Sequence, residues 1–117
     1  MLNYRDRPNL VATLKGTGSG GRSLILNGHI DTVTVEPVTE WTHQPYGAEI
    51  ADGKMYGRGV SDMKSGIVAA VIAIECLLEL GVRLRGDLIF ESVVNEEHSG
   101  NGTLACVARG ITADAAI

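Results

Sequence analysis

The chain has 117 residues, of which 44% are hydrophobic and 21% charged, and its formal net charge is −4. These values are ordinary for one globular domain and exclude a disordered chain or a low-complexity fibre. The 10 basic residues are scattered along an acidic chain, so we expect no nucleic-acid partner. The longest apolar run, Ile67–Ile74, is far shorter than the roughly 20 residues of a membrane span. We therefore expect a buried helix there, no membrane contact and, because the polar N-terminus resembles no signal peptide, a cytoplasmic protein.

The first half of the chain alternates short apolar runs with turn residues, which predicts strands. In chain order we predict a strand at Asn9–Lys15, a turn at Gly16–Gly21, a strand at Arg22–Asn27, a long loop at Thr32–Tyr46 and a hairpin formed by Ala48–Ile50 and Lys54–Tyr56. The long loop holds Pro37 and Pro45 and shows little periodicity. Loops of that length in a compact domain are usually functional.

The second half predicts helices between strands. We predict a helix at Ser65–Leu80 with Gly81 as its C-cap, a strand at Asp87–Val94, a helix that begins at Ser99 or Thr103 and ends at Arg109, and a further strand beginning at Ala113–Ile117. This alternation predicts an α/β fold, a layered sheet with helices on its faces. Ligands of such sheets bind at the carboxyl ends of the strands. We therefore expect chemistry just after Asn27, just after Val94 and in the loop before the long helix.

Two cysteines, Cys76 and Cys106, lie in apolar runs of helical character. Free cysteines are among the most buried residue types, so both are predicted to be buried thiols. Neither belongs to a C-x-x-C pair, and no thiolate metal site or disulfide scaffold is indicated.

The first cluster of polar residues is Asn27-Gly28-His29-Ile30-Asp31, at the end of an apolar strand. His29 and Asp31 alternate on an extended chain and point the same way. A metal-binding histidine needs an acceptor for its other ring nitrogen, and Asp31 is well placed to be that acceptor. The alternative is an ordinary histidine and aspartate at a strand end.

The second cluster, Tyr56–Gly66, precedes the long helix and contains Asp62. An aspartate there commonly caps a helix or stabilises its dipole. Its carboxylate could equally bridge two cations. The pair Gly57 and Gly59 lacks the remaining residues of a P-loop or a dinucleotide fingerprint, which excludes both.

The third cluster places Glu96 and Glu97 after the strand Asp87–Val94. Adjacent residues of an extended chain point to opposite sides, so one acid could bind metal while the other handles a proton. The alternative is a solvated acidic loop, and His98 and His43 are interpreted as ordinary loop histidines. Taken together, the three clusters supply imidazole and carboxylates at one edge of the sheet, a set that suits zinc, and also manganese or cobalt.

These three motifs, in this order and spacing, resemble the acetylornithine deacetylase / succinyl-diaminopimelate desuccinylase family of dinuclear zinc hydrolases, which also includes aminoacylases and carboxypeptidases. The resemblance runs from about Asn9 to Ile117. It implies a three-layer α/β/α zinc-exopeptidase-like fold with a mostly parallel core sheet, incomplete in this chain. It also implies two divalent metal ions, zinc or alternatively cobalt or manganese.

By this resemblance His29 binds one zinc ion, Asp31 orients the imidazole, and Asp62 bridges both metals. In the family the peptide bond after this aspartate is often cis, here Asp62-Met63. Glu97 would bind the second zinc ion. Glu96 would be the general base, taking a proton from a metal-activated water as it attacks an amide carbonyl and giving it to the leaving amine.

The resemblance further implies a longer parent protein. A further carboxylate ligand is expected beyond Ile117 and a histidine ligand near the C-terminus of the parent. We therefore expect residues 1–117 to be a partial catalytic domain, without the lid or dimerisation domain and without the C-terminal catalytic segment. The parent is expected to be a homodimer.

The substrate implied by the resemblance is a small N-acyl amino acid or a short peptide. A deacetylase or deacylase of amino-acid biosynthesis is favoured, because the stretch His98–Thr103 resembles the deacetylase-like branch. Two alternatives stay open: a metallo-exopeptidase of the carboxypeptidase or dipeptidase type, and a catalytically inactive metal-binding fragment.

Overall fold

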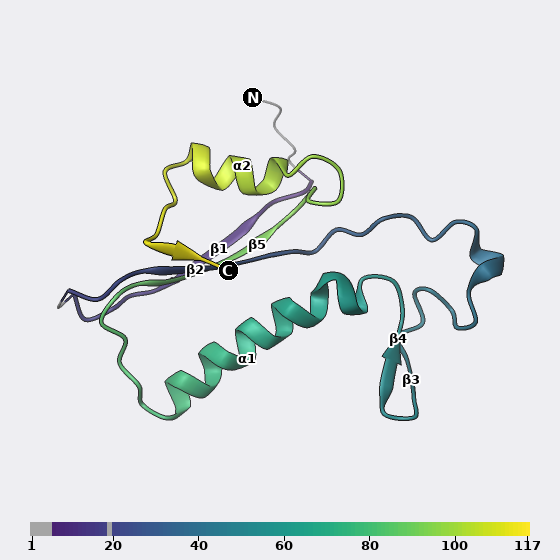
Figure 1. Ribbon diagram of the computed structural model, residues 1–117, viewed down its shortest axis with the longest axis horizontal. Coiled ribbons are helices and arrows are strands. Elements are labelled where there is room, and N and C mark those ends of the chain that lie inside the picture. The colour runs from purple at the N-terminus through teal and green to yellow at the C-terminus, as the bar shows by residue number, and fades with distance from the viewer. Residues whose placement is uncertain (1–5, 19) are drawn as a thin grey trace.

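The centre of the structure is a four-stranded sheet in the order β1-β5-β2-β6 (Figure 1). The computed structural model describes residues 6–18 and 20–117. The strands are β1 (Leu10–Leu14), β2 (Leu24–His29), β5 (Leu88–Val93) and β6 (Ala115–Ala116). β2 runs parallel to β5 and to β6, whereas β1 pairs with β5 antiparallel. The sheet is therefore mixed and mostly parallel, which confirms the predicted fold class.

Two helices cover opposite faces of this sheet (Figure 1). The long helix α1 (Ser65–Glu79) follows an irregular helical turn, η2 (Val60–Lys64), and the short helix α2 (Asn101–Ala108) follows β5. Gly28 of β2 faces the side chains of Ile67 and Met63 on the α1 side. This gives the layer order helix, sheet, helix.

A small hairpin of β3 (Glu49–Ala51) and β4 (Lys54–Tyr56) stands apart from the sheet (Figure 1). The segment that leads to it, predicted as a loop, is irregular apart from one turn of 3-10 helix, η1 (Val38–Glu40). No helix in the described part of the chain is long and apolar enough to cross a bilayer.

β2 differs from its prediction at both ends. It begins at Leu24 and continues to His29, because the parallel register with β5 extends as far as the pair His29 and Val93. His29 is therefore the last residue of a central strand and not the first residue of a loop. This pairing fixes the main chain of His29 independently of any bound ligand.

The prediction that the run Ile67–Ile74 forms a buried helix is wrong. No residue of α1 is buried, and Val68 and Ile72 are about half exposed. Only a stripe of residues spaced three or four apart is partly covered: Met63, Ile67, Ala70, Ile74 and Leu77. The sheet covers this one side of α1, and nothing in the described part of the chain packs on the other.

The two cysteines differ in burial, because only one of them faces the sheet. Cys76 lies outside the covered stripe of α1 and is exposed, so its predicted burial is wrong. Cys106 of α2 faces the sheet and is buried, as predicted. Burial raises the pKa of the Cys106 thiol, and the negative charge of Glu91 raises it further.

α2 approaches the end of β5 closely because Gly102 has no side chain. A Cβ atom at Gly102 would lie 2.2 Å from the main-chain oxygen of Val94 and 2.7 Å from its nitrogen. Contacts this short with main-chain atoms cannot be relieved by a side-chain rotation. The first turn of α2 can therefore rest on Val94 only with glycine at this position.

We predict that Gly102→Ala lowers the free energy of unfolding by about 1–3 kcal/mol, the usual cost of overpacking. Urea denaturation measures this change. Gly66→Ala is the matched control, because its Cβ meets only the flexible end of Met63 and alanine favours helix. Equal stability of both variants would contradict the packing argument.

A second contact joins the end of β1 to the start of β5. The Asp87 carboxylate accepts hydrogen bonds from Lys15 Nζ at 2.7 Å and from the main-chain N–H of Gly16 at 2.9 Å. The Lys15 ammonium and the Gly16 N–H hold the pKa of Asp87 below its ordinary value. The contact therefore stabilises the fold above the ordinary aspartate pKa of about 3.9 and is lost as the pH falls through the lowered value.

We predict that Asp87→Asn lowers the melting temperature at pH 7 and that this difference shrinks as the pH is lowered toward about 3. Thermal melts followed by circular dichroism measure it. Glu40→Gln, at an exposed position in η1, removes one negative charge without removing an ion pair. An Asp87→Asn difference that does not depend on pH would show that its charge is not what stabilises the contact.

Candidate metal centre

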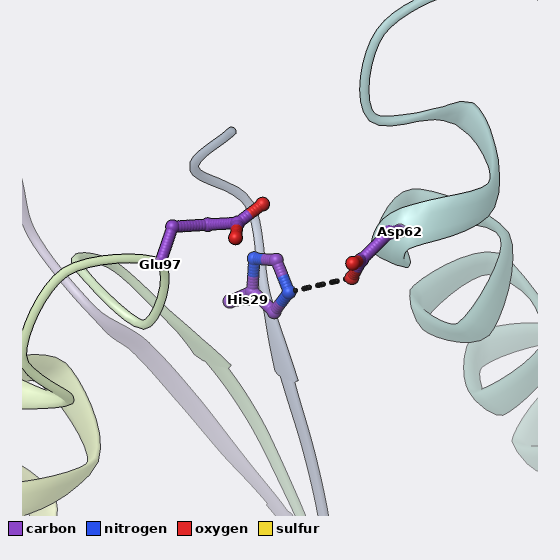
Figure 2. Close-up of side chains that lie close together, drawn as sticks. All are labelled: His29, Asp62 and Glu97. Carbon is purple, nitrogen blue, oxygen red and sulfur yellow. Dashed lines mark hydrogen bonds and ion pairs between the residues drawn. The ribbon is translucent and has the colours of Figure 1, made fainter. Parts of the chain in front are cut away.

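Three potential metal ligands meet at the carboxyl edge of the parallel strands (Figure 2). His29 ends β2, Asp62 lies in η2 before α1, and Glu97 lies in the loop that follows β5. One ligand atom from each of the three residues lies within 4.8 Å of the others. The segments predicted to carry chemistry are thus brought together by the topology of the sheet.

The imidazole of His29 is held at both nitrogens. Nδ1 lies 3.0 Å from the main-chain oxygen of Asp31, and Nε2 lies 3.0 Å from Oδ1 of Asp62. Burial of His29, which is 4% exposed, lowers its pKa, but the bonds to Asp31 and Asp62, together with the negative charges of Glu96 and Asp31, raise the pKa above its ordinary value. Because Nδ1 donates to a carbonyl, Nε2 is the nitrogen available to a cation, which would replace the proton held there.

Asp31 contacts His29 in a different way from the one expected. The main-chain oxygen of Asp31, and not its carboxylate, lies nearest to the ring; the carboxylate oxygen Oδ1 is 3.6 Å from Nδ1. The carboxylate instead accepts hydrogen bonds from the main-chain N–H groups of Glu96 and Glu97, each at 3.2 Å. Burial raises the pKa of Asp31, but these two N–H donors, together with its own main-chain N–H and the charge of His29, lower the pKa below its ordinary value.

Asp62 is not a helix cap. No side-chain capping bond is present in η2 or at the start of α1, and Asp62 itself has a non-helical conformation with φ −115° and ψ 101°. Its side chain is 78% exposed and points toward His29 (Figure 2). The Asp62-Met63 peptide bond is cis, as the family resemblance implies.

Gly59 allows the turn that carries Asp62 to approach the end of β2. Its φ of 78° lies in the left-handed region, and a Cβ atom there would lie 2.5 Å from Cγ2 of Thr32. A side chain at this position would be strained and would also push the turn away from Thr32. The glycine therefore helps to bring Asp62 to His29.

The two adjacent glutamates occupy different positions. Glu97 belongs to the ligand cluster, whereas Oε2 of Glu96 lies 3.6 Å from Nε2 of His29 and its side chain is about half exposed. Their loop folds back on Asn95, whose main-chain oxygen accepts bonds from the N–H groups of Ser99 and Gly100. The loop thus presents one carboxylate to the cluster and leaves the other beside it, facing solvent.

The remaining histidines lie outside the ligand cluster. His43 stacks on Tyr56 with 3.9 Å between ring centroids, and its Nδ1 pairs with Glu49 at 2.9 Å. These contacts belong to the separate hairpin region. His98, next to Glu97, is exposed.

Sequence reasoning missed a buried glutamate in the central sheet and its asparagine partner. Glu91, in the middle of β5, is 3% exposed and accepts a hydrogen bond from Nδ2 of Asn27, its neighbour on β2, at 2.7 Å. It also missed Asn9, whose side chain bonds to three residues near the loop 94–100 between β5 and α2, called here the acidic loop. A glutamate in the middle of a mostly apolar strand was the one signal that could have indicated the first of these.

The donor set itself fits a divalent metal ion. One imidazole nitrogen and two carboxylates are the ligands that Zn²⁺ accepts, and Mn²⁺ and Co²⁺ accept similar sets. The main-chain acceptor at Nδ1 supplies the outer contact that metal-bound histidines usually have. The residues present can therefore hold such an ion.

Comparisons with known proteins identify the family. Residues 25–117 match the family described as Peptidase family M20/M25/M40. The chain is 50% identical over 115 residues to N-formyl-4-amino-5-aminomethyl-2-methylpyrimidine deformylase of Halalkalibacterium halodurans, covering 97% of this chain and 27% of that protein. It is 39% identical over 118 residues to succinyl-diaminopimelate desuccinylase of Dechloromonas aromatica, covering 97% of this chain and 31% of that protein.

Solved structures show the same fold. An M20 family metallo-carboxypeptidase from Sulfolobus solfataricus matches with a TM-score of 0.80 and 26% identity, over 94% of this chain and 25% of that one. Human carnosine dipeptidase 1 matches with a TM-score of 0.73 and 26% identity, over 87% of this chain and 22% of that one.

The fold and these relatives define the class of the domain as the α/β domain found in M20 metallopeptidases. More particularly, the chain belongs to peptidase family M20/M25/M40, and the resemblance to the desuccinylases is confirmed. Membership implies divalent metal ions. The chain spans 27% to 31% of the length of the two curated relatives named above.

We predict that Asp31→Ala frees the acidic loop, because two main-chain N–H groups lose their common acceptor. Amide hydrogen exchange at Glu96 and Glu97 should accelerate about tenfold or more, as expected for the loss of a bond to a charged acceptor. NMR exchange measurements follow both amides individually. Glu40→Ala is the control, and unchanged exchange in Asp31→Ala would contradict the contact.

Proposed function

We propose that residues 1–117 form the metal-binding part of an enzyme that hydrolyses the amide bond of small N-acyl compounds. The observation that carries this proposal is the cluster of His29, Asp62 and Glu97, whose ligand atoms lie within 4.8 Å of one another, with the Glu96 carboxylate beside it. The names of the two curated relatives support it, since both describe the removal of an acyl group, formyl or succinyl.

His29, Asp62 and Glu97 are the proposed metal ligands. Asp62 is proposed to be shared between two ions, because its exposed carboxylate has two oxygens and no capping role. We propose Zn²⁺, with Co²⁺ or Mn²⁺ as alternatives. When bound, such ions polarise a carbonyl group and lower the pKa of water to about 7.

Glu96 is the proposed general base. Its carboxylate takes a proton from the water whose oxygen forms the new bond to the carbonyl carbon, and gives a proton to the amine nitrogen as the C–N bond breaks. The products are a carboxylic acid and an amine. The half-exposed position of Glu96 next to His29 leaves room for a substrate to approach. The Asp31 carboxylate accepts a hydrogen bond from the main-chain N–H of Glu96 and so fixes its main chain.

The proposed substrate is a small N-acyl amino acid or related N-acyl amine. A metallo-exopeptidase acting on short peptides is the second candidate, and the carboxypeptidase and dipeptidase structures favour it. The inactive metal-binding fragment is the remaining alternative. A partial catalytic domain of a homodimeric longer protein remains our prediction from the family resemblance. A cytoplasmic location without nucleic-acid or membrane partners remains our prediction from the charge, the short apolar run and the polar N-terminus.

Calorimetric titration of the purified chain with Zn²⁺ tests the ligand set. We predict binding of up to two ions and a loss of affinity of about tenfold or more in His29→Ala and in Asp62→Ala, because each removes a donor from the cluster. His43→Ala is the matched control, since His43 also pairs with a carboxylate but lies in the hairpin region. Equal losses in His29→Ala and His43→Ala, or no Zn²⁺ binding at all, would refute the proposed centre.

Glu96→Gln tests the reaction. We predict that it keeps Zn²⁺ affinity within about twofold and lowers amide hydrolysis by about 10²–10⁴-fold, the usual effect of losing a general base. Release of free amine from N-formyl, N-acetyl and N-succinyl amino acids is the assay, with Glu40→Gln as control. Hydrolysis that survives Glu96→Gln would remove Glu96 from the mechanism. Zn²⁺ binding by the unsubstituted 117-residue chain without any hydrolysis would favour the inactive fragment.

A further inference from the structure

The side chain of Asn9 connects the two ends of the acidic loop. Its Oδ1 accepts a hydrogen bond from the N–H of Val94, where the loop leaves β5, at 3.1 Å. Its Nδ2 donates to the main-chain oxygen of Gly102, where the loop has entered α2, at 2.7 Å. The loop between these two bonds carries Glu96 and Glu97.

We propose that Asn9 is a positioning residue for this loop, fixing the separation of its two ends and thereby the placement of Glu96 and Glu97 at the metal centre. The inference rests on the proposed function of that centre. It assigns a role to a residue that lies outside the three polar clusters and comes from the opposite end of the chain.

The chemistry of the amide explains why asparagine suits this position. One end of the contact is a donor, the Val94 N–H, and the other is an acceptor, the Gly102 oxygen, so the bridging group must both accept and donate. Asp would keep the acceptor but would turn a second oxygen toward the Gly102 oxygen. Leu has nearly the same shape but can form neither bond.

The position of Asn9 is itself fixed by the sheet. It precedes β1, whose first residue, Leu10, is paired with Ser92 of β5. Asn9 therefore lies beside the last residues of β5, next to the point where the loop begins. The same nitrogen Nδ2 also lies 3.4 Å from the buried Sγ of Cys106, which places the amide against α2.

Asn9 and Asp31 hold the loop at different places. The carboxylate of Asp31 binds the two main-chain N–H groups at the glutamates themselves, and Asn9 binds the base of the loop. The two glutamates are adjacent to each other and close to Asp31 and Asp62, so like charges oppose their approach. Both anchors counter that repulsion through main-chain groups and leave the glutamate carboxylates free.

The test compares Asn9→Leu and Asn9→Asp with two control variants of the same chain. Asn101→Asp adds the same charge nearby at an exposed side chain, and Leu14→Ala weakens the far end of β1 without touching the loop. The readouts are amide exchange at Glu96 and Glu97 without metal, affinity for Zn²⁺ alone, and melting temperature. The first readout does not depend on metal binding.

We expect both Asn9 variants to accelerate exchange at Glu96 and Glu97 about tenfold and to weaken Zn²⁺ binding by a similar factor. Asn101→Asp should leave both unchanged, and Leu14→Ala should lower the melting temperature while Zn²⁺ affinity stays within about twofold. If Asn9→Leu does not fold, Asn9→Asp is compared with the same two control variants instead.

Two results would overturn the proposal. One is that the Asn9 variants keep the amide exchange rates and the Zn²⁺ affinity of the unsubstituted chain. The other is that Leu14→Ala loses as much Zn²⁺ affinity as Asn9→Leu for the same fall in melting temperature, which would reduce Asn9 to a general structural role. If the parental chain binds no Zn²⁺, the proposed function fails, and the exchange rates still decide whether Asn9 holds the loop.

Discussion

The candidate centre depends on the parallel pairing of β2 with β5. This pairing runs from Leu24 and Leu88 to His29 and Val93, so both strands end at the same edge of the sheet. The histidine and the acidic loop then emerge side by side, and Nε2 of His29 lies 3.6 Å from Oε2 of Glu96. Everything else at the site, including the turn that carries Asp62, is arranged around this edge.

The contacts that refine this arrangement are made largely by main-chain groups. The imidazole is oriented by a carbonyl oxygen, and the acidic loop is held by its own N–H groups. The main chain thus holds the loop without using the carboxylates of Glu96 and Glu97, whereas Oδ1 of Asp62 lies 3.0 Å from Nε2 of His29. Buried His29 supplies the rigid member of the cluster and exposed Asp62 the accessible one.

The sequence was sufficient to bring the proposed ligand residues to one edge of the sheet, but not to predict their supporting contacts. His29, Glu96 and Glu97 follow apolar runs that predict parallel strands, and such strands deliver their ends to one edge. The role of the Asp31 carbonyl could not be predicted, because every residue has a carbonyl and only the fold determines which one faces a ring. The burial of α1 was mispredicted because an apolar pattern indicates what a helix could bury, whereas the surrounding chain decides what covers it. Asn9 carried no signal at all, since a single amide before a strand is unremarkable.

The sequence separation of the interacting residues has a consequence for folding. His29 and Asp62 are 33 positions apart, and Asp31 and Glu97 are 66 apart, so an unfolded chain brings these groups together only rarely. A cation held by the cluster would bind the native state almost exclusively. Its binding free energy would then be added to the stability of the sheet, about 2.7 kcal/mol at a free concentration one hundred times the dissociation constant. The metal concentration around the protein would in this way set how often the whole domain unfolds.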